Sequence, residues 1–266
     1  MALDPLKLPW RLYFTILPWV VAFFGLLLAS FINALMYRID KGFKYPKIFV
    51  QPSHCEKCKK KLRWFDLIPV VSFLIYKGKC SQCGKKIFWF YPLSELVLGI
   101  SMYGFFIGGA PLELYVVLLL LFSMSYFDVL YRAVPKWLIH FGLVLGVLYA
   151  AWRYLSGVEL ALSGLLVSAI ISIVFLLINL SKKSFGLGDI LIIVFVGLFL
   201  SYKLVILFLL GAIFSGALYG VYLVIKDRKN LKATIPFVPF LYLGFVISVW
   251  GGDALWSLFA KGLPLW

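Results

Sequence analysis

Acidic residues, and charge in general, are scarce in this sequence. Of its 266 residues, 14% are charged and 63% are hydrophobic, and the 11 Asp and Glu are outnumbered by 26 Lys and Arg. Soluble domains carry about 25% charged residues, so the composition excludes an ordinary water-soluble fold. We expect a chain whose main solvent is the lipid bilayer.

Histidine is the next shortage. The two histidines, His54 and His140, belong to different regions of the chain, and neither lies in a recognisable nucleophile motif. A serine or cysteine nucleophile normally needs a histidine beside it, so that chemistry is poorly supported. We expect His140 to be an interior group of its helix and keep His54, next to Cys55, as a conceivable substitute metal ligand.

Long apolar runs are what the sequence has in abundance. A bilayer core of about 30 Å needs roughly 20 apolar residues per helix. Polar breaks leave apolar runs at residues 13–37, 92–108, 112–130, 136–153, 158–180, 189–202, 204–225 and 236–260. We therefore predict an all-α polytopic membrane protein with about eight transmembrane helices. Only Ser201, Tyr202 and Lys203 separate the sixth run from the seventh, so a seven-helix count stays open.

In the eight-helix arrangement, most Lys and Arg residues fall on one side of the membrane. If residues 38–91 are cytoplasmic, 21 of the 26 Lys and Arg lie on that side, and both termini face outward. Basic residues accumulate in cytoplasmic loops, so the sorting favours this orientation. Topology then explains the net charge of +15, which implies contact with anionic lipid headgroups and calls for no nucleic-acid partner.

The polar stretch 38–91 divides the chain. It contains all four cysteines and half of the Lys and Arg. We expect a first transmembrane helix over residues 1–37, a small cytoplasmic domain over 38–91, and a larger transmembrane domain over 92–266.

The cysteines form two Cys-x-x-Cys pairs, Cys55 with Cys58 and Cys80 with Cys83, separated by 21 residues. Two such pairs can present four thiolates tetrahedrally to zinc. Disulfides are disfavoured in a loop that charge places in the reducing cytosol, and unmetallated thiols are a third alternative. The sequence offers no further ligand or nearby carboxylate that would indicate an open, catalytic coordination position. We therefore predict a structural zinc site.

Two carboxylates lie at the edge of apolar runs. Asp128 ends one run and Asp189 opens another, and the predicted topology places both at the cytoplasmic ends of their helices. An ionisable residue at membrane depth is a functional candidate by default. When two carboxylates share a site, one stays protonated while the other ionises, so the pair can activate water and protonate an amide. An intramembrane aspartic endopeptidase is the favoured interpretation.

Other readings of the acidic residues stay open at this point. The same pair of carboxylates suits a transporter, and Asp128 has Arg132 one turn later as a structural partner. Asp189 has Lys182 and Lys183 nearby in the same way. Elsewhere, Asp66 is expected to pair with Arg63 in the polar domain. Ser94 and Glu95 could cap the second transmembrane helix, but they also face the membrane edge.

Glycines precede the second carboxylate. Gly186 and Gly188 flank Leu187 directly before Asp189. Residues without a Cβ allow a tight turn and the close approach of an extended peptide. A protease must bind its substrate extended, so we predict that these glycines form an active-site loop.

These features together resemble the type IV prepilin peptidases, a family of GxGD intramembrane aspartic proteases. The resemblance covers almost the whole chain. The segments that carry it are ASFINALMYR at 29–38, PSHCEKC at 52–58, RWFDLIPVVS at 63–72, GKCSQC at 78–83, YPLSEL at 91–96, Asp128 ahead of Pro135, GLGD at 186–189 and IPFVPF at 235–240.

The resemblance implies an activity and its residues. Asp128 and Asp189 would be the catalytic pair, and the four cysteines would bind zinc. The substrates would be type IV prepilins and type II secretion pseudopilins, cut after a glycine that ends a short basic leader at the cytoplasmic face of the bacterial inner membrane. Members with this cysteine domain commonly also methylate the new N-terminal residue with S-adenosylmethionine. No Gly-rich dinucleotide-type loop indicates where that cofactor would bind.

Two positions depart from the family pattern. Leu191 stands where a Lys is usual, and Lys136 stands where an acidic residue is common after the proline. Neither is a catalytic carboxylate, so the protease interpretation is unaffected. Presenilin-like proteases share the GxGD and late proline motifs, but the cysteine domain argues against that alternative.

Overall fold

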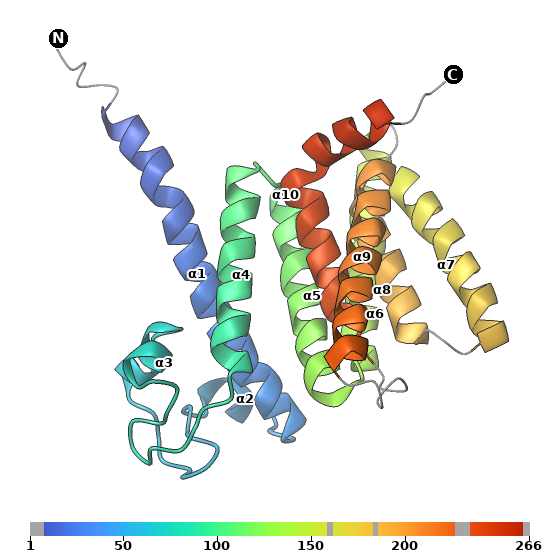
Figure 1. Ribbon diagram of the computed structural model, residues 1–266. Helices are drawn as coiled ribbons and strands as arrows, with labels where there is room; N and C mark the ends of the chain where they lie inside the picture. Colours follow the sequence, from blue (N-terminus) through green and yellow to red (C-terminus); the bar gives the residue numbers. More distant parts are fainter. Residues whose placement is uncertain (1–7, 159–161, 183–185, 227–234, 263–266) are drawn as a thin grey trace. The chain divides into compact units, whose positions relative to one another are not determined.

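The computed structural model describes residues 8–158, 162–182, 186–226 and 235–262, and the regular structure of this part of the chain is helical (Figure 1). Two isolated β-bridges, at His54 with Lys61 and at Lys79 with Lys86, accompany the helices. The all-α prediction is confirmed. The helices are α1 (Leu8–Asp40), α2 (Lys47–Val50), η1 (Trp64–Leu67), α3 (Val71–Ile75), α4 (Phe90–Ile107), α5 (Leu112–Tyr131), α6 (Lys136–Leu155), α7 (Ser163–Lys182), α8 (Leu187–Gly197), α9 (Tyr202–Lys226) and α10 (Val238–Gly262).

Length and composition make this a multi-pass membrane protein. Each of the eight predicted apolar runs contains a helix, and α8 and the described part of α10 are shorter apolar helices. Residues 159–161 of the fifth run, and Lys183 and residues 227–232 of the predicted basic loops, lie outside the described residues. The helices long and apolar enough to cross a bilayer are Thr15–Asp40, Phe90–Ile107, Leu112–Tyr131, Lys136–Leu155, Ser163–Leu180 and Tyr202–Lys226.

Local sequence sets the helix ends near the candidate site. α5 stops where Arg132 adopts a left-handed backbone with φ of 56°. α6 follows Pro135, whose missing N–H would have had no partner at a helix start. The weak break predicted near Lys203 is real, because a turn over residues 198–201 separates α8 from α9.

The chain divides into two compact units, residues 1–109 and 110–266. In the first unit, α1 and α4 pack along each other, and the polar insertion between them carries α2, η1 and α3 (Figure 1). A Cβ added to Gly25 would lie 2.9 Å from the Cα of Gly99, so the two helices approach closely through small residues. The three-part division expected from the sequence stays a prediction.

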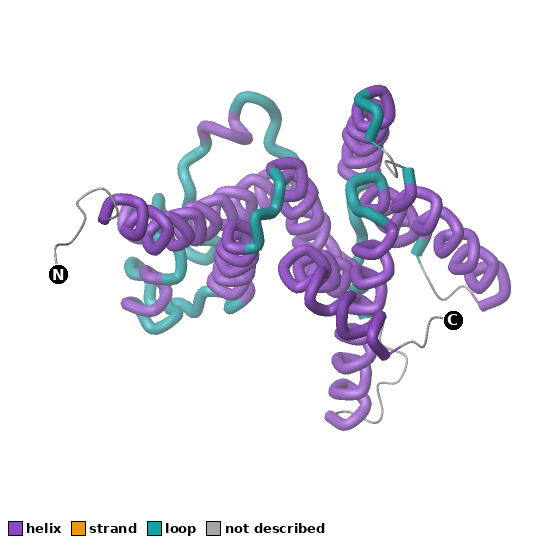
Figure 2. Tube along the Cα trace, turned by 90° about the horizontal axis from the view of Figure 1, so that it is seen from above, coloured by secondary structure: helices purple, strands orange, loops and turns teal. Residues whose placement is uncertain are grey.

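The second unit is a bundle of α5 to α10 (Figures 1 and 2). α10 packs against α9 and α5, whereas α8 packs against α6 and α7. Fully buried aromatic side chains from three of these helices, Phe195, Phe208 and Phe245, contribute to its core. Asp128 lies in the last turn of α5 and Asp189 in the first turn of α8.

Candidate active site and metal centre

Asp128 is held against the beginning of α10. Its side chain is buried, and its Oδ2 accepts a hydrogen bond of 2.9 Å from the N–H of Val238, the first residue of that helix. The N–H of Phe237 is a second donor, and Arg132 adds a favourable electrostatic interaction. The N-terminal end of a helix carries partial positive charge, so this position suits a carboxylate.

Asp189 also lies at the beginning of a helix, in the first turn of α8. It is partly buried, and its Oδ2 accepts the N–H of Gly186 at 3.3 Å. This bond satisfies one of the amides that the first turn of α8 leaves free. The expected partners Lys182 and Lys183 have side chains outside the described part of the chain.

The structure brings the two predicted carboxylates together from different helices. Asp128 on α5 and Asp189 on α8 are close enough for their charges to interact. Repulsion between two carboxylates favours protonation of one of them, which leaves the ionised group able to accept a proton and the protonated group able to donate one. The arrangement is therefore suited to acid and base steps on one bound group.

The two glycines of the predicted loop do not form the tight turn that we expected. Gly186 has φ of −71° and ψ of 138°, a backbone open to any residue, and Gly188 is inside α8. Neither has a left-handed φ, so a tight turn is not the reason for glycine here. Space is a reason at Gly186, because an added Cβ would lie 3.1 Å from Oδ2 of Asp189.

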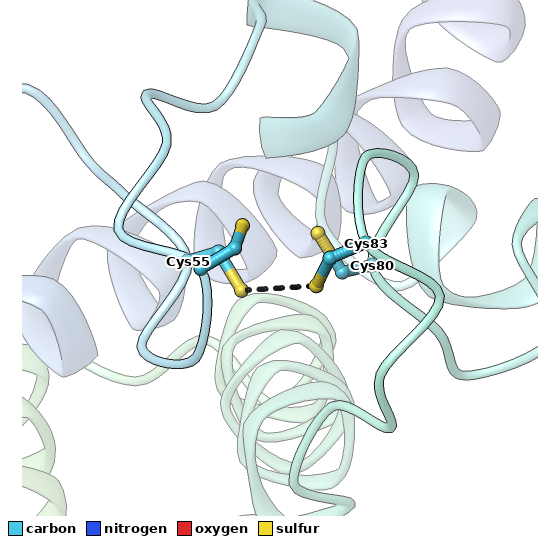
Figure 3. A group of neighbouring side chains, drawn as sticks. Cys55, Cys80 and Cys83 are labelled. Atoms are coloured by element: carbon cyan, nitrogen blue, oxygen red, sulfur yellow. Dashed lines mark hydrogen bonds between the residues drawn. The ribbon is translucent and has the colours of Figure 1, made fainter.

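The four cysteines form one cluster. Their sulfur atoms all lie within 4.8 Å of one another, and Cys55 Sγ is 3.9 Å from Cys83 Sγ (Figure 3). All four are free thiols, so the disulfide alternative is wrong for this structure. Four thiolates at this spacing could hold a metal ion, and sulfur ligands of this number suit zinc.

The two cysteine pairs are built on the same backbone turn. Cys55 N–H donates to the carbonyl oxygen of Lys60, and Cys80 N–H donates to that of Lys85, at 3.0 and 2.9 Å. In each turn the residue four positions after the first cysteine, Lys59 or Gly84, has a positive φ and donates its N–H back to that cysteine's carbonyl oxygen. The repeated geometry presents both pairs toward a common point.

The protein environment shifts the pKa values of two of the thiols in opposite directions. Burial raises the pKa of Cys55, but hydrogen bonds from the backbone N–H groups of Cys58 and Lys57 outweigh it and lower that pKa to about 7. For Cys83, a backbone hydrogen bond from Lys85 lowers the pKa, but burial and the neighbouring thiols raise it to about 11. Zinc is bound by thiolates, so a metal ion at this cluster would displace the thiol protons.

Both histidines differ from their predicted places. His54 is not part of the cysteine cluster, and its Nδ1 lies 3.4 Å from the carbonyl oxygen of Pro52. The idea that it substitutes for a cysteine ligand therefore has no support. His140 is exposed on α6, so its predicted interior position is wrong.

A polar contact in the first unit was missed from the sequence. α4 begins at Phe90 without a side-chain cap, so the capping role expected for Ser94 and Glu95 is wrong. Instead, Glu95 Oε2 accepts the N–H of Val70 at 2.8 Å, and Ser94 Oγ accepts a hydrogen bond from the side-chain amide of Asn33. The local signal for this contact was the pair of polar residues inside an apolar helix.

Comparison with known proteins identifies the family. Residues 23–108 match the bacterial peptidase A24 N-terminal domain, and residues 115–221, which include Asp128 and Asp189, match the type IV leader peptidase family. A prepilin leader peptidase/N-methyltransferase of Bacillus subtilis (strain 168) is 30% identical, over 91% of this chain and 97% of the relative. The chain belongs to the type IV leader peptidase family.

Other relatives carry the same name. One from Xanthomonas campestris pv. campestris is 27% identical over 86% of this chain and 90% of its own length. One from Legionella pneumophila is 24% identical over 93% of this chain and 94% of its own. No solved structure matches the chain. The relatives do not favour the transporter or presenilin-like alternatives.

Proposed function

We propose that this chain is a prepilin leader peptidase, an aspartic endopeptidase with Asp128 and Asp189 as its catalytic pair. Its substrates are precursors of type IV pilins and of type II secretion pseudopilins, cut after the glycine that ends a basic leader. The observation that carries the proposal is the interaction of these two carboxylates from α5 and α8, inside the region that matches the family.

The proposed reaction needs no metal. One carboxylate is ionised and accepts a proton from a water molecule as the water oxygen attacks the scissile carbonyl carbon. The other carboxyl group gives its proton to the carbonyl oxygen, which forms a tetrahedral diol. The C–N bond then breaks as the nitrogen takes the proton that the first carboxylate received from water. One hydroxyl of the diol returns its proton to the second carboxylate, so the products are a carboxylic acid and a free amine. The backbone at Gly186 and Gly188 is proposed to lie beside the extended substrate.

We further propose that Cys55, Cys58, Cys80 and Cys83 hold a structural zinc ion. Their chemistry supports it, because four clustered sulfur ligands form a closed tetrahedral site. Zinc would stabilise a cytoplasmic domain over residues 38–91, which has few regular elements of its own. Residues 1–37 would be a separate first helix and residues 92–266 the peptidase domain.

A second activity is proposed from the relatives' name. The chain would transfer a methyl group to the new N-terminal amine of the cleaved substrate, with S-adenosylmethionine as the methyl donor. We assign no residue to this cofactor. The protein would span the bacterial inner membrane several times with the active site facing the cytoplasm, in contact with lipids and without a nucleic-acid partner.

Cleavage in a purified system tests the proposal. The full-length protein, solubilised in detergent, is incubated with a prepilin that has a glycine before its hydrophobic helix. Mass spectrometry then measures both leader removal and methylation. Asp128→Asn and Asp189→Asn should each lower cleavage by about a thousandfold or more, since each removes a proton-transfer group. Asp66→Asn is the control and should cleave at the wild-type rate. Absence of wild-type cleavage, or normal cleavage by both variants, would refute the proposal.

A further inference from the structure

Two side chains of α5 hold the same residue at the beginning of α10. Ser125 Oγ donates to the carbonyl oxygen of Val238 at 3.3 Å, while Asp128 Oδ2 accepts the N–H of Val238 at 2.9 Å. Ser125 and Asp128 are three residues apart, so they lie on one face of the helix. Val238 is fully buried. The contact therefore ties α5 to α10 at the carboxylate itself.

The sequence around this contact makes two backbone amides available to Asp128. The prolines at 236 and 239 have no N–H to offer. The next two amides, after Pro239, donate to the carbonyl oxygen of Phe237 at 3.0 and 3.1 Å. Within residues 236–241, the amides left without a helical partner are those of Phe237 and Val238, and both donate to Asp128. The two amides at the start of α10 thus find their acceptor in the Asp128 carboxylate of α5.

We propose that Ser125 is a positioning residue, and that Ser125 with Phe237 and Val238 forms a clasp that orients the Asp128 carboxylate toward Asp189. The inference rests on the proposed peptidase function. Two donors from one helix end fix the rotation of the carboxylate, and the serine hydroxyl prevents that helix end from shifting along α5. A displacement of about 1 Å at a reacting group can cost on the order of a hundredfold in rate.

A neighbouring serine separates positioning from packing. Ser123 lies on the same helix and is buried, but its Oγ donates to the carbonyl oxygen of Leu119 within α5. Among the residues that the structure describes, it makes no hydrogen bond to α10 of the kind that Ser125 makes. Ser123→Ala therefore removes the same atoms as Ser125→Ala while leaving the clasp intact.

The first test compares steady-state cleavage by Ser125→Ala, Ser125→Thr and Ser123→Ala. Ser125→Ala should lower kcat about tenfold or more with KM within about twofold, because orientation of Asp128 acts on the chemical step. Threonine keeps the hydroxyl, so Ser125→Thr should restore most of the activity. Ser123→Ala should behave as the wild type. Equal kcat values for the two alanine variants would overturn the proposal.

The second test does not depend on cleavage. Hydrogen exchange is measured in lipid nanodiscs on a peptide covering residues 235–241, whose two amides donated to Asp128 should be protected. Asp128→Ala should speed exchange of those two amides about tenfold or more, since their acceptor is gone. Asp189→Ala, the matched control, should leave them protected.

The two readouts separate the clasp from the enzyme function. If Asp128→Ala leaves exchange unchanged, the clasp is refuted even where the wild type cleaves prepilin. If exchange responds as expected but the wild type does not cleave, the proposed peptidase function fails while the clasp is supported.

Discussion

The carboxylate of Asp189 folds back against Gly186, three residues earlier. Its Oδ2 accepts the glycine N–H at 3.3 Å and lies 3.1 Å from the position that a Cβ at residue 186 would occupy. That spacing is tighter than ordinary contact, so a methyl group there would push the carboxylate away. The glycine thus sets where the second carboxylate can lie.

Gly186→Ala should therefore impair cleavage. The displaced carboxylate would lose its alignment with Asp128, and we expect kcat/KM to fall about tenfold or more. Gly188→Ala is the comparison variant, because its Cβ would make an ordinary contact of 3.4 Å with Cδ1 of Ile139. Both variants are assayed on one prepilin. Equal losses would indicate that both glycines serve the approach of substrate, as the sequence suggested, and that the position of Asp189 is not the cause.

Features encoded locally were predictable from the sequence. Apolar runs and polar breaks predicted the places of eight helices of the described chain, including the break near Lys203, because spanning a bilayer demands a run of apolar residues. The Cys-x-x-Cys spacing predicted the sulfur cluster because each pair closes within one short turn. Asp66 likewise pairs with Arg63 as expected, at 3.1 Å and three residues apart.

Features made by distant backbone groups were not predictable. The partner of Asp128 is an amide 110 residues away, and a backbone amide has no signature in a sequence. The prolines at 236 and 239 were the available local signal, since they limit which amides of this segment can donate to a side chain. The role of Gly186 was also hidden, because its reason is the space beside Asp189 and not a special backbone angle.

The cysteine cluster predicts a specific pattern of metal loss. Cys80 is the most buried of the four, and Cys80→Ser should abolish stoichiometric zinc, because a closed site with three thiolates binds far more weakly. His54→Ala is the control next to Cys55 and should keep about one zinc per chain, since His54 is outside the cluster. Metal is measured by inductively coupled plasma mass spectrometry after dialysis. Full zinc in Cys80→Ser, or loss in His54→Ala, would contradict the four-sulfur site.

The Arg63–Asp66 pair predicts a pH dependence of the polar insertion. Burial raises the pKa of Asp66, but hydrogen bonds from the side chain and backbone N–H of Arg63 outweigh it, so its pKa lies below the ordinary 3.8. A lowered pKa in the folded state means that the pair's contribution is complete above pH 3.8 and is lost as pH falls through the folded-state pKa.

Hydrogen exchange of the Arg63 amide, corrected for intrinsic rates, checks this dependence. Wild type should be better protected than Asp66→Asn at neutral pH, and the difference should shrink as pH falls below 3.8. A difference that is constant across this range would show that ionisation of Asp66 does not stabilise the turn.

Glu95 predicts a stability effect in the first unit that is separate from catalysis. Its Oε2 accepts the N–H of Val70, a residue with φ of 59° at the turn before α3. Glu95→Ala leaves this amide without its acceptor, which should cost about 1–3 kcal/mol of unfolding free energy. Glu95→Gln keeps an oxygen at the same place and should cost less. Thermal unfolding in detergent measures both, and equal losses would mean that the carboxylate's charge, and not its acceptor role toward Val70, stabilises this unit.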